Sequence, residues 1–253
     1  MAKIIAIANQ KGGVGKTTTS VNLAACLAEL KQKVLVIDMD PQGSATSGFN
    51  INKVEQENTV YELLLSDCSI GECILQDVME NLSLIPSNVN LAAAEIELIG
   101  VADKEFILNK EIEWVKDNYD YILIDCPPAL NTLTLNAFTA ASEVLVPIQC
   151  EYMALEGLSD LITTINLVKE RLNPALDLEG IVFTMYDART NLSSQVVEEV
   201  TSHFPDKVYQ SIIPRNIRLS EAPSFGQPIT LYDSKSSGAQ AYRELAAEVI
   251  KRK

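Results

Sequence analysis

The chain has 253 residues with 20 Lys or Arg and 34 Asp or Glu, so its formal net charge is −14 at pH 7. This charge argues against a general nucleic-acid binder, and one histidine cannot form a histidine metal cluster. That histidine, His203, stands near the end of a predicted helix, which argues against Ser-His-Asp catalysis. The length suits one large α/β domain, and no Pro/Gly/Ser-rich linker divides residues 1–253, so we expect a single domain.

A glycine-rich loop between a strand and a helix dominates the N-terminal part. Residues 3–8 form a short apolar run typical of a buried parallel strand, and apolar residues recur at helical spacing over residues 16–30. The loop between them reads KGGVGKTT at 11–18, and its end, Gly15-Lys16-Thr17, is the close of a phosphate loop. Backbone N–H groups and the helix N-terminus of such a loop surround phosphates, and its lysine reaches the β and γ oxygens. The sequence therefore predicts a nucleotide site.

This loop carries a second cation. The ordinary pattern G-x-x-x-x-G-K-[ST] places a glycine at position 10, but here Gln10 is followed by Lys11. A lysine at the start of the loop is poorly placed to fold back onto its own γ-phosphate, whereas it can reach the phosphates of a facing subunit. We therefore expect a homodimer in the ATP-bound state that encloses two nucleotides.

Three further apolar runs, separated by helical stretches, complete the predicted fold. They cover residues 33–37, 121–124 and 144–147. Strands that alternate with helices in this way pair in parallel. We therefore predict an α/β fold of the P-loop NTPase class: a single domain with a mostly parallel twisted sheet and helices on both faces.

Acidic residues follow two of these strands. Asp38 and Asp125 end their runs and Asp40 comes shortly after, so all three are expected near the glycine loop at the carboxyl edge of the sheet. Asp125 is the candidate to hold Mg²⁺ through water, and Thr17 offers a hydroxyl ligand directly. Asp40 is the candidate to orient the attacking water and is counted with the metal-site residues. Asp38 either fixes the loop or helps with the metal, or it only caps the end of the strand.

The charge is unevenly distributed along the chain. Residues 1–159 contain 9 basic and 22 acidic residues, whereas residues 160–253 contain 11 and 12, including every arginine. Exposed charges are screened beyond roughly 8 Å at physiological salt, so a local arginine surface can bind phosphates despite the acidic remainder.

The cysteines and the hydropathy of the chain indicate the cellular compartment of the protein. Five scattered cysteines without a C-x-x-C pair indicate reduced, mostly buried thiols. No signal region precedes the first strand and no apolar run approaches the length of a membrane span. We therefore expect a soluble cytoplasmic protein.

Taken together, these motifs resemble the deviant-Walker ATPases, and within them the ParA proteins of chromosome and plasmid partition, the Soj-type members most closely. The resemblance covers nearly the whole chain and rests on KGGVGKTTT at 11–19, DMDPQGSAT at 38–46, ILIDCPP at 122–128, TMYDARTNLS at 184–193 and IPRNIRLSEAPSFGQPI at 213–229. It implies a slow, Mg²⁺-dependent ATP hydrolase that dimerises on ATP, binds DNA non-specifically at the nucleoid and is stimulated by a ParB-like centromere-binding protein.

The resemblance also implies roles for particular residues. Lys11 becomes the signature lysine across the dimer, Lys16 the phosphate lysine of its own subunit, and Asp40 the hydrolytic aspartate. The expected nucleotide contacts are Lys11, Gly12, Gly13, Val14, Gly15, Lys16, Thr17 and Thr18, with Pro214, Arg215 and Asn216 around the adenine.

Arg189 and Arg218 fall where related proteins present arginines to the DNA backbone. Each also has a simpler interpretation, because Arg189 stands near Asp187 and Arg218 near Glu221. The helix expected over residues 193–204 contains two glutamates and no lysine, so the positive surface is thin.

Two other functions compete with partition. A MinD-like membrane-cycling ATPase for division-site placement needs a C-terminal amphipathic extension. We expect the apolar face of residues 238–253 to cover the sheet instead, so no membrane partner is expected. A metabolic enzyme, such as an amidoligase or a nitrogenase-like iron protein, is the third class. The iron protein needs paired cysteines at a shared cluster, and Cys126 and Cys150 do not stand in matching contexts.

Overall fold

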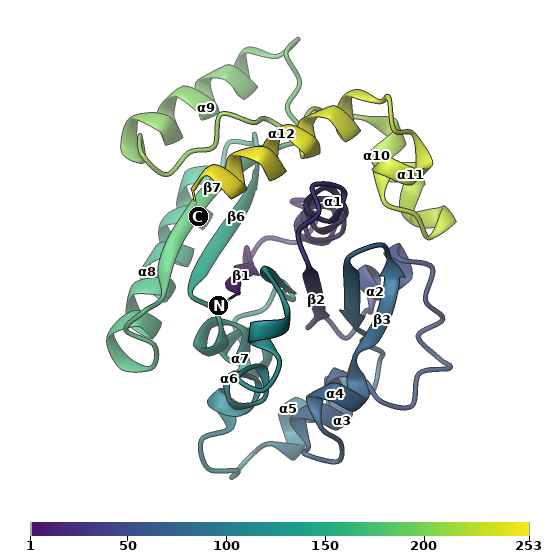
Figure 1. The fold of residues 1–253 in the computed structure, drawn as a ribbon. Helices are drawn as coiled ribbons and strands as arrows, with labels where there is room; N and C mark the ends of the chain where they lie inside the picture. Colours follow the sequence, from purple (N-terminus) through teal and green to yellow (C-terminus); the bar gives the residue numbers. More distant parts are fainter. Residues whose placement is uncertain (1, 253) are drawn as a thin grey trace.

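The computed structural model describes residues 2–252, and within them seven strands form one sheet in the order β3-β4-β2-β5-β1-β6-β7 (Figure 1). Neighbouring strands are parallel except for the antiparallel pair β3 and β4, which confirms the predicted fold class. The strands are β1 (Lys3–Ile7), β2 (Val34–Asp38), β3 (Leu75–Met79), β4 (Leu82–Ile85), β5 (Tyr121–Asp125), β6 (Glu143–Gln149) and β7 (Asp177–Thr184).

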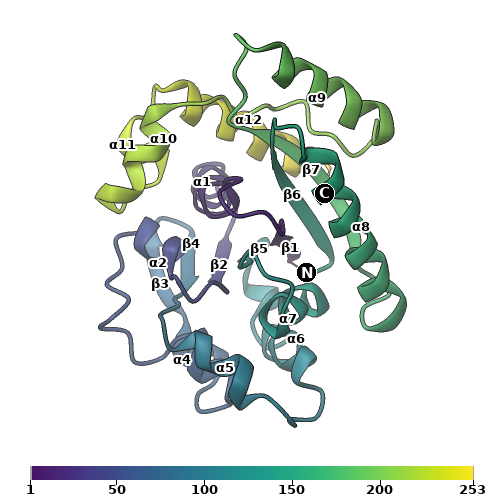
Figure 2. The same cartoon turned by 180° about the vertical axis from the view of Figure 1, so that it is seen from behind.

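Helices connect the strands and cover the sheet on both faces (Figures 1 and 2). The α-helices are α1 (Lys16–Glu29), α2 (Ser44–Gly48), α3 (Val60–Leu64), α4 (Ile70–Cys73), α5 (Leu91–Glu97), α6 (Ile107–Ile112), α7 (Thr132–Ala140), α8 (Ala154–Arg171), α9 (Asn191–His203), α10 (Ile217–Glu221), α11 (Ile229–Tyr232) and α12 (Ser237–Lys251). Short 3₁₀ helices are η1 (Lys104–Phe106), η2 (Lys116–Asn118) and η3 (Ala222–Phe225).

Two apolar clusters form the core, one on each face of the sheet. Side chains of a strand alternate between faces, so Ile5 and Ile7 pack on the side of α1 and α12, while Ala6 packs on the side of α3, α7 and α8. The central strands β2 and β5 are buried along their whole length. These strands end close together in register, with Asp38 opposite Asp125, so the sheet brings both acids to one edge.

The predicted C-terminal helix forms as α12, which packs against α1 and joins the apolar core on that face of the sheet. Its apolar face, including Tyr242 and Leu245, is buried in the core. The last residue of the predicted segment, Lys253, lies outside the described residues. Among residues 2–252, no helix combines the length and the apolar character of a membrane span. The five cysteines are free thiols, and four of them are buried.

Strands β3, β4 and β7 were not predicted from the sequence. In β7, the sequence DLEGIVFT interrupts the apolar run with Glu179 and Gly180. Glu179 is nevertheless buried, because Lys3 lies 2.9 Å from its carboxylate and the Tyr209 hydroxyl donates to it at 2.5 Å. Only distant partners in the fold make this strand position acceptable for a charge.

Candidate nucleotide site

The glycine loop runs from the end of β1 to the start of α1. Gly13 and Gly15 have φ values of +76° and +89°, a region in which other residues are strained. Gly15 is the N-cap of α1 and supplies no side-chain acceptor, so the first amides of the helix remain available to an anion. Thr184 at the end of β7 fixes the loop, since its hydroxyl donates to the Val14 carbonyl at 2.7 Å.

The Lys16 side chain is buried beneath this loop. Its ammonium donates to the Lys11 carbonyl at 3.1 Å, so it bridges the two ends of the loop. Burial lowers the pKa of Lys16, and the negative charges of Asp125 and Asp40 oppose that shift. The structure therefore places a cation between the glycine loop and the predicted acids.

Asp125 and Thr17 meet as the sequence predicted. The Thr17 hydroxyl donates to one Asp125 oxygen at 2.8 Å, and the Ser20 hydroxyl donates to the other at 2.6 Å. Burial, followed by the charge of Asp38, raises the pKa of Asp125 to about 7. A buried carboxylate beside a second acid and an all-oxygen donor set suits Mg²⁺.

The candidate metal site is sparse in protein ligands. Within residues 2–252, no three His, Cys, Asp or Glu side chains gather into a metal cage. Mg²⁺ is usually held by one or two carboxylates together with substrate phosphates and water, so Thr17 and Asp125 fit this ion when it arrives with a nucleotide.

Asp38 makes the contacts of a loop-fixing residue. It is fully buried, and one of its oxygens accepts from both the amide and the hydroxyl of Thr46, each at 2.7 Å. Burial raises its pKa to about 6. Of the roles left open by the sequence, these bonds are those of a residue that fixes the loop.

Asp40 is half-buried in the loop between β2 and α2. One of its carboxylate oxygens accepts from the Gln42 amide at 2.9 Å. Asp40 contributes to the electrostatic environment of both Lys16 and Asp125, so the structure brings these three predicted residues together.

Lys11 has a partner within its own chain. Its ammonium forms an ion pair with Glu151, which follows β6. The two side chains are 43% and 41% exposed, so the pair lies at the surface. Glu151 was not among the residues predicted from the sequence.

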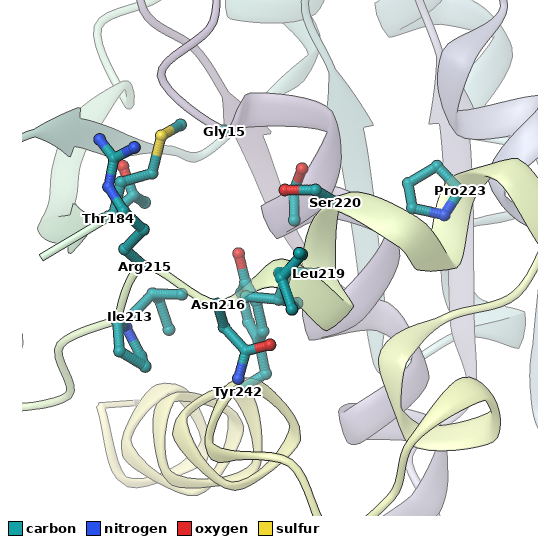
Figure 3. Close-up of a pocket in the computed structure, with 13 residues that line it drawn as sticks. Gly15, Thr184, Ile213, Arg215, Asn216, Leu219, Ser220, Pro223 and Tyr242 are labelled. Atoms are coloured by element: carbon teal, nitrogen blue, oxygen red, sulfur yellow. The ribbon is translucent and has the colours of Figure 1, made fainter.

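A cavity of about 550 Å³ adjoins the loop at Gly15 and Thr18. Figure 3 shows Gly15 and Thr184 on one side of it and Tyr242 of α12 on the other. Its size is that of a ligand pocket. The lining includes the predicted residues Pro214, Arg215 and Asn216, together with Met185, Ile213, Ile217, Leu219, Ser220 and Pro223.

The polar groups of Asn216 are already engaged at the edge of this cavity. Its side-chain oxygen, Oδ1, accepts from the Arg218 amide at 2.8 Å and caps α10. Its side-chain NH₂ group donates to the Ser237 hydroxyl at 2.7 Å. Asn216 therefore shapes the cavity by joining α10 to α12.

Several cavity residues escaped the sequence analysis. Thr184 and Met185 lie in the quoted TMYDARTNLS segment, which was the available signal for them, and Met185 has a φ of +50°. Tyr242 was assigned only to the apolar face of its helix. Its place in the cavity wall depends on how α12 packs against α1.

The two predicted DNA-binding arginines are both ion-paired. Arg189 is 84% exposed and donates to both oxygens of Asp187, at 2.8 and 2.7 Å. This guanidinium lowers the pKa of Asp187. Arg218 contacts Glu221 at 2.9 Å and Asp233 at 3.4 Å. A phosphate that binds either arginine must compete with a carboxylate.

Comparison with known proteins places this geometry among nucleotide-dependent enzymes. A family model described as an AAA domain matches residues 2–178. The chain is 57% identical to the sporulation initiation inhibitor protein Soj of Bacillus subtilis, over 98% of both chains. It is 52% identical to the chromosome partitioning protein ParA of Myxococcus xanthus, covering 100% of this chain and 89% of that protein.

Solved structures show the same fold. Cobyrinic acid a,c-diamide synthase of Mycobacterium smegmatis with a bound ATP analogue and magnesium has a TM-score of 0.87 at 36% identity, covering 99% of this chain and 95% of that one. A plasmid partition protein of Borrelia burgdorferi has a TM-score of 0.81 at 28% identity, covering 100% and 99%.

Proposed function

The chain belongs to the Soj/ParA family of chromosome-partitioning ATPases, and from this we propose that it is an ATP-driven switch that dimerises, binds DNA without sequence preference and partitions DNA. We further propose a ParB-like protein as its stimulating partner and the cytoplasmic nucleoid as its place of action.

One observation carries the nucleotide part of this proposal. The glycine loop, the Thr17–Asp125 pair and the 550 Å³ cavity are contiguous, so one ligand with a phosphate chain and a flat base fits all three. The magnesium and ATP analogue in the M. smegmatis neighbour support the same ligand for this chain. Thr17 and Asp125 would hold Mg²⁺, whose charge offsets that of the β- and γ-phosphates.

The residues divide the chemistry between them. Lys16 binds the phosphates of the nucleotide in its own subunit. Asp40, in the loop between β2 and α2, orients the attacking water. Phosphoryl transfer depends on positioning and charge stabilisation, so a single subunit hydrolyses ATP slowly. In the dimer, the partner subunit's Lys11 adds a cation to the same phosphates.

A metabolic function has less support than partition. The synthase neighbour is 36% identical to this chain, whereas Soj is 57% identical over the same extent. We therefore assign the partition role and not an amide-forming reaction.

DNA binding is expected to be weak and sensitive to salt, because Arg189 and Arg218 are paired with acids in the free chain. Two arginines per subunit neutralise about four phosphates per dimer, so log K should fall against log salt with a slope near −3.6. Replacing Arg189 or Arg218 singly by alanine should flatten this slope, while Arg171→Ala at the end of α8 removes the same single charge and serves as the control.

Sedimentation and gel-shift measurements test the switch. Wild-type protein and the Asp40→Ala variant should dimerise and bind DNA with Mg·ATP but not with ADP, and Lys11→Ala should stay monomeric while still binding nucleotide. The switch is refuted if Lys11→Ala dimerises with Mg·ATP as wild type does, or if Asp40→Ala stays monomeric with Mg·ATP. Absence of DNA binding at low salt with ATP removes the DNA role, and sedimentation with liposomes instead would assign the protein to the membrane-cycling class.

A further inference from the structure

A buried serine, Ser87, holds the backbone of Asp40. Ser87 is not among the residues predicted to contact the nucleotide or Mg²⁺. Ser87 follows β4 and is fully buried. Its hydroxyl donates to the Asp40 carbonyl at 2.8 Å, and its amide donates to the Thr46 hydroxyl oxygen at 2.9 Å. Ser87 therefore binds the loop between β2 and α2 at Asp40 and helix α2 at Thr46.

Thr46 extends this arrangement to Asp38. Its hydroxyl accepts from Ser87 and donates to Asp38, which in turn accepts the Asp40 amide at 3.3 Å. The peptide groups of Asp40 are thus held on the N–H side by Asp38 and on the C=O side by Ser87. These bonds form a closed circuit through Asp38, Asp40, Thr46 and Ser87, so losing one of them loosens the hold on Asp40.

Close packing restricts the same loop. Gly43 has a φ of +61°, and a Cβ on this residue would lie 2.7 Å from the Ser87 carbonyl oxygen. The Gly43 amide donates to the Asp40 carbonyl at 2.9 Å, so this oxygen accepts two bonds. The loop therefore rests directly on the Ser87 backbone.

We propose that Ser87 is a positioning residue for ATP hydrolysis, which acts with Thr46 to hold the Asp40 carboxylate where it orients water. This inference rests on the proposed function, because it requires Asp40 to act in hydrolysis. Displacing a catalytic group by about 1 Å can cost a factor of about 10² in rate, so a distant hydroxyl can control the chemical step.

The test compares Ser87→Ala with wild-type protein in single-turnover ATP hydrolysis. We expect the rate to fall about tenfold, the size of one ordinary hydrogen bond, with ATP affinity unchanged because Ser87 does not touch the nucleotide loop. Ser83→Ala is the matched control. Ser83 is a buried serine of β4 whose hydroxyl bonds to Gln76 and not to the Asp40 loop.

Two further measurements separate positioning from loss of structure. Hydrogen exchange at the amides of residues 42–46 should accelerate in Ser87→Ala, while the melting temperature stays close to that of Ser83→Ala. Thr46→Val removes the hydroxyl at constant shape and should reduce the rate, whereas Thr46→Ser retains it and should preserve the rate. This pair carries the test if Ser87→Ala does not fold.

Each result has a defined meaning. A Ser87→Ala rate equal to wild type, an equal loss in Ser83→Ala, or a loss confined to ATP affinity overturns the positioning role. If Asp40→Ala hydrolyses ATP as fast as wild type, the proposed function itself fails. If Asp40→Ala is inactive and Ser87→Ala is unimpaired, the inference about Ser87 fails alone.

Discussion

Replacing Glu151 by glutamine is expected to strengthen the ATP-dependent dimer. In the free chain, Glu151 pairs with the ammonium of Lys11, and this pair must open before Lys11 can reach a nucleotide in another subunit. Glu151→Gln removes the competing carboxylate and leaves the side-chain volume nearly unchanged. The variant therefore releases Lys11 for the contact across the interface.

The solvent exposure of the Lys11–Glu151 ion pair determines how much the dimer is strengthened. With side chains 43% and 41% exposed, the ion pair is a surface bridge, for which ~0.2–1 kcal/mol is typical. Two bridges open per dimer, so the gain is ~0.4–2 kcal/mol, and the dimer dissociation constant should fall about 2- to 30-fold. Screening by salt should reduce the effect.

Sedimentation equilibrium with Mg·ATP measures this effect in an Asp40→Ala background, where hydrolysis does not interfere. Glu156→Gln removes the same charge from an exposed site in the first turn of α8 and serves as the control. A weaker dimer in Glu151→Gln would show that Glu151 supports the dimer and does not restrain Lys11. An equal gain in Glu156→Gln would show that overall charge, and not this pair, limits association.

Three other perturbations test the site and the fold. Lys16→Ala should weaken binding of a fluorescent ATP analogue at least tenfold, because the lost contact is a charge-assisted one worth ~1.5–3 kcal/mol; unchanged binding would contradict its phosphate role. Burial raises the pKa of Glu143 to about 7, so the folded state retains a proton that the unfolded state releases. The stability of wild type should therefore fall as pH rises from about 4.5 to about 7, and urea melts of Glu143→Gln should show a shallower decline. Gly180→Ala places a Cβ 2.6 Å from the Tyr209 ring and should cost ~1–3 kcal/mol in the same melts, whereas Gly157→Ala, whose Cβ meets no described atom within 4 Å, should not destabilise.

The local chemistry of the nucleotide site could be predicted from the sequence. The glycine loop needs particular residues in consecutive positions, and its strand and helix flank it directly, so the order of residues specifies the geometry. The Thr17–Asp125 contact was also predictable, because parallel strands place their carboxyl ends at one edge of the sheet. Helix α12 was predicted to cover the sheet from its apolar face alone.

Only the tertiary structure decided what these groups contact. The ion pair of Lys11 with Glu151 joins positions 140 residues apart. The hydrogen bond from Ser87 to the Asp40 carbonyl joins positions 47 residues apart. No local periodicity encodes such contacts, because they depend on how strands far apart in the chain are ordered in the sheet. For the same reason, β7 could not be predicted from the sequence, because Glu179 interrupts its apolar run. Lys3 and Tyr209, which bind the Glu179 carboxylate, lie far from it in the chain.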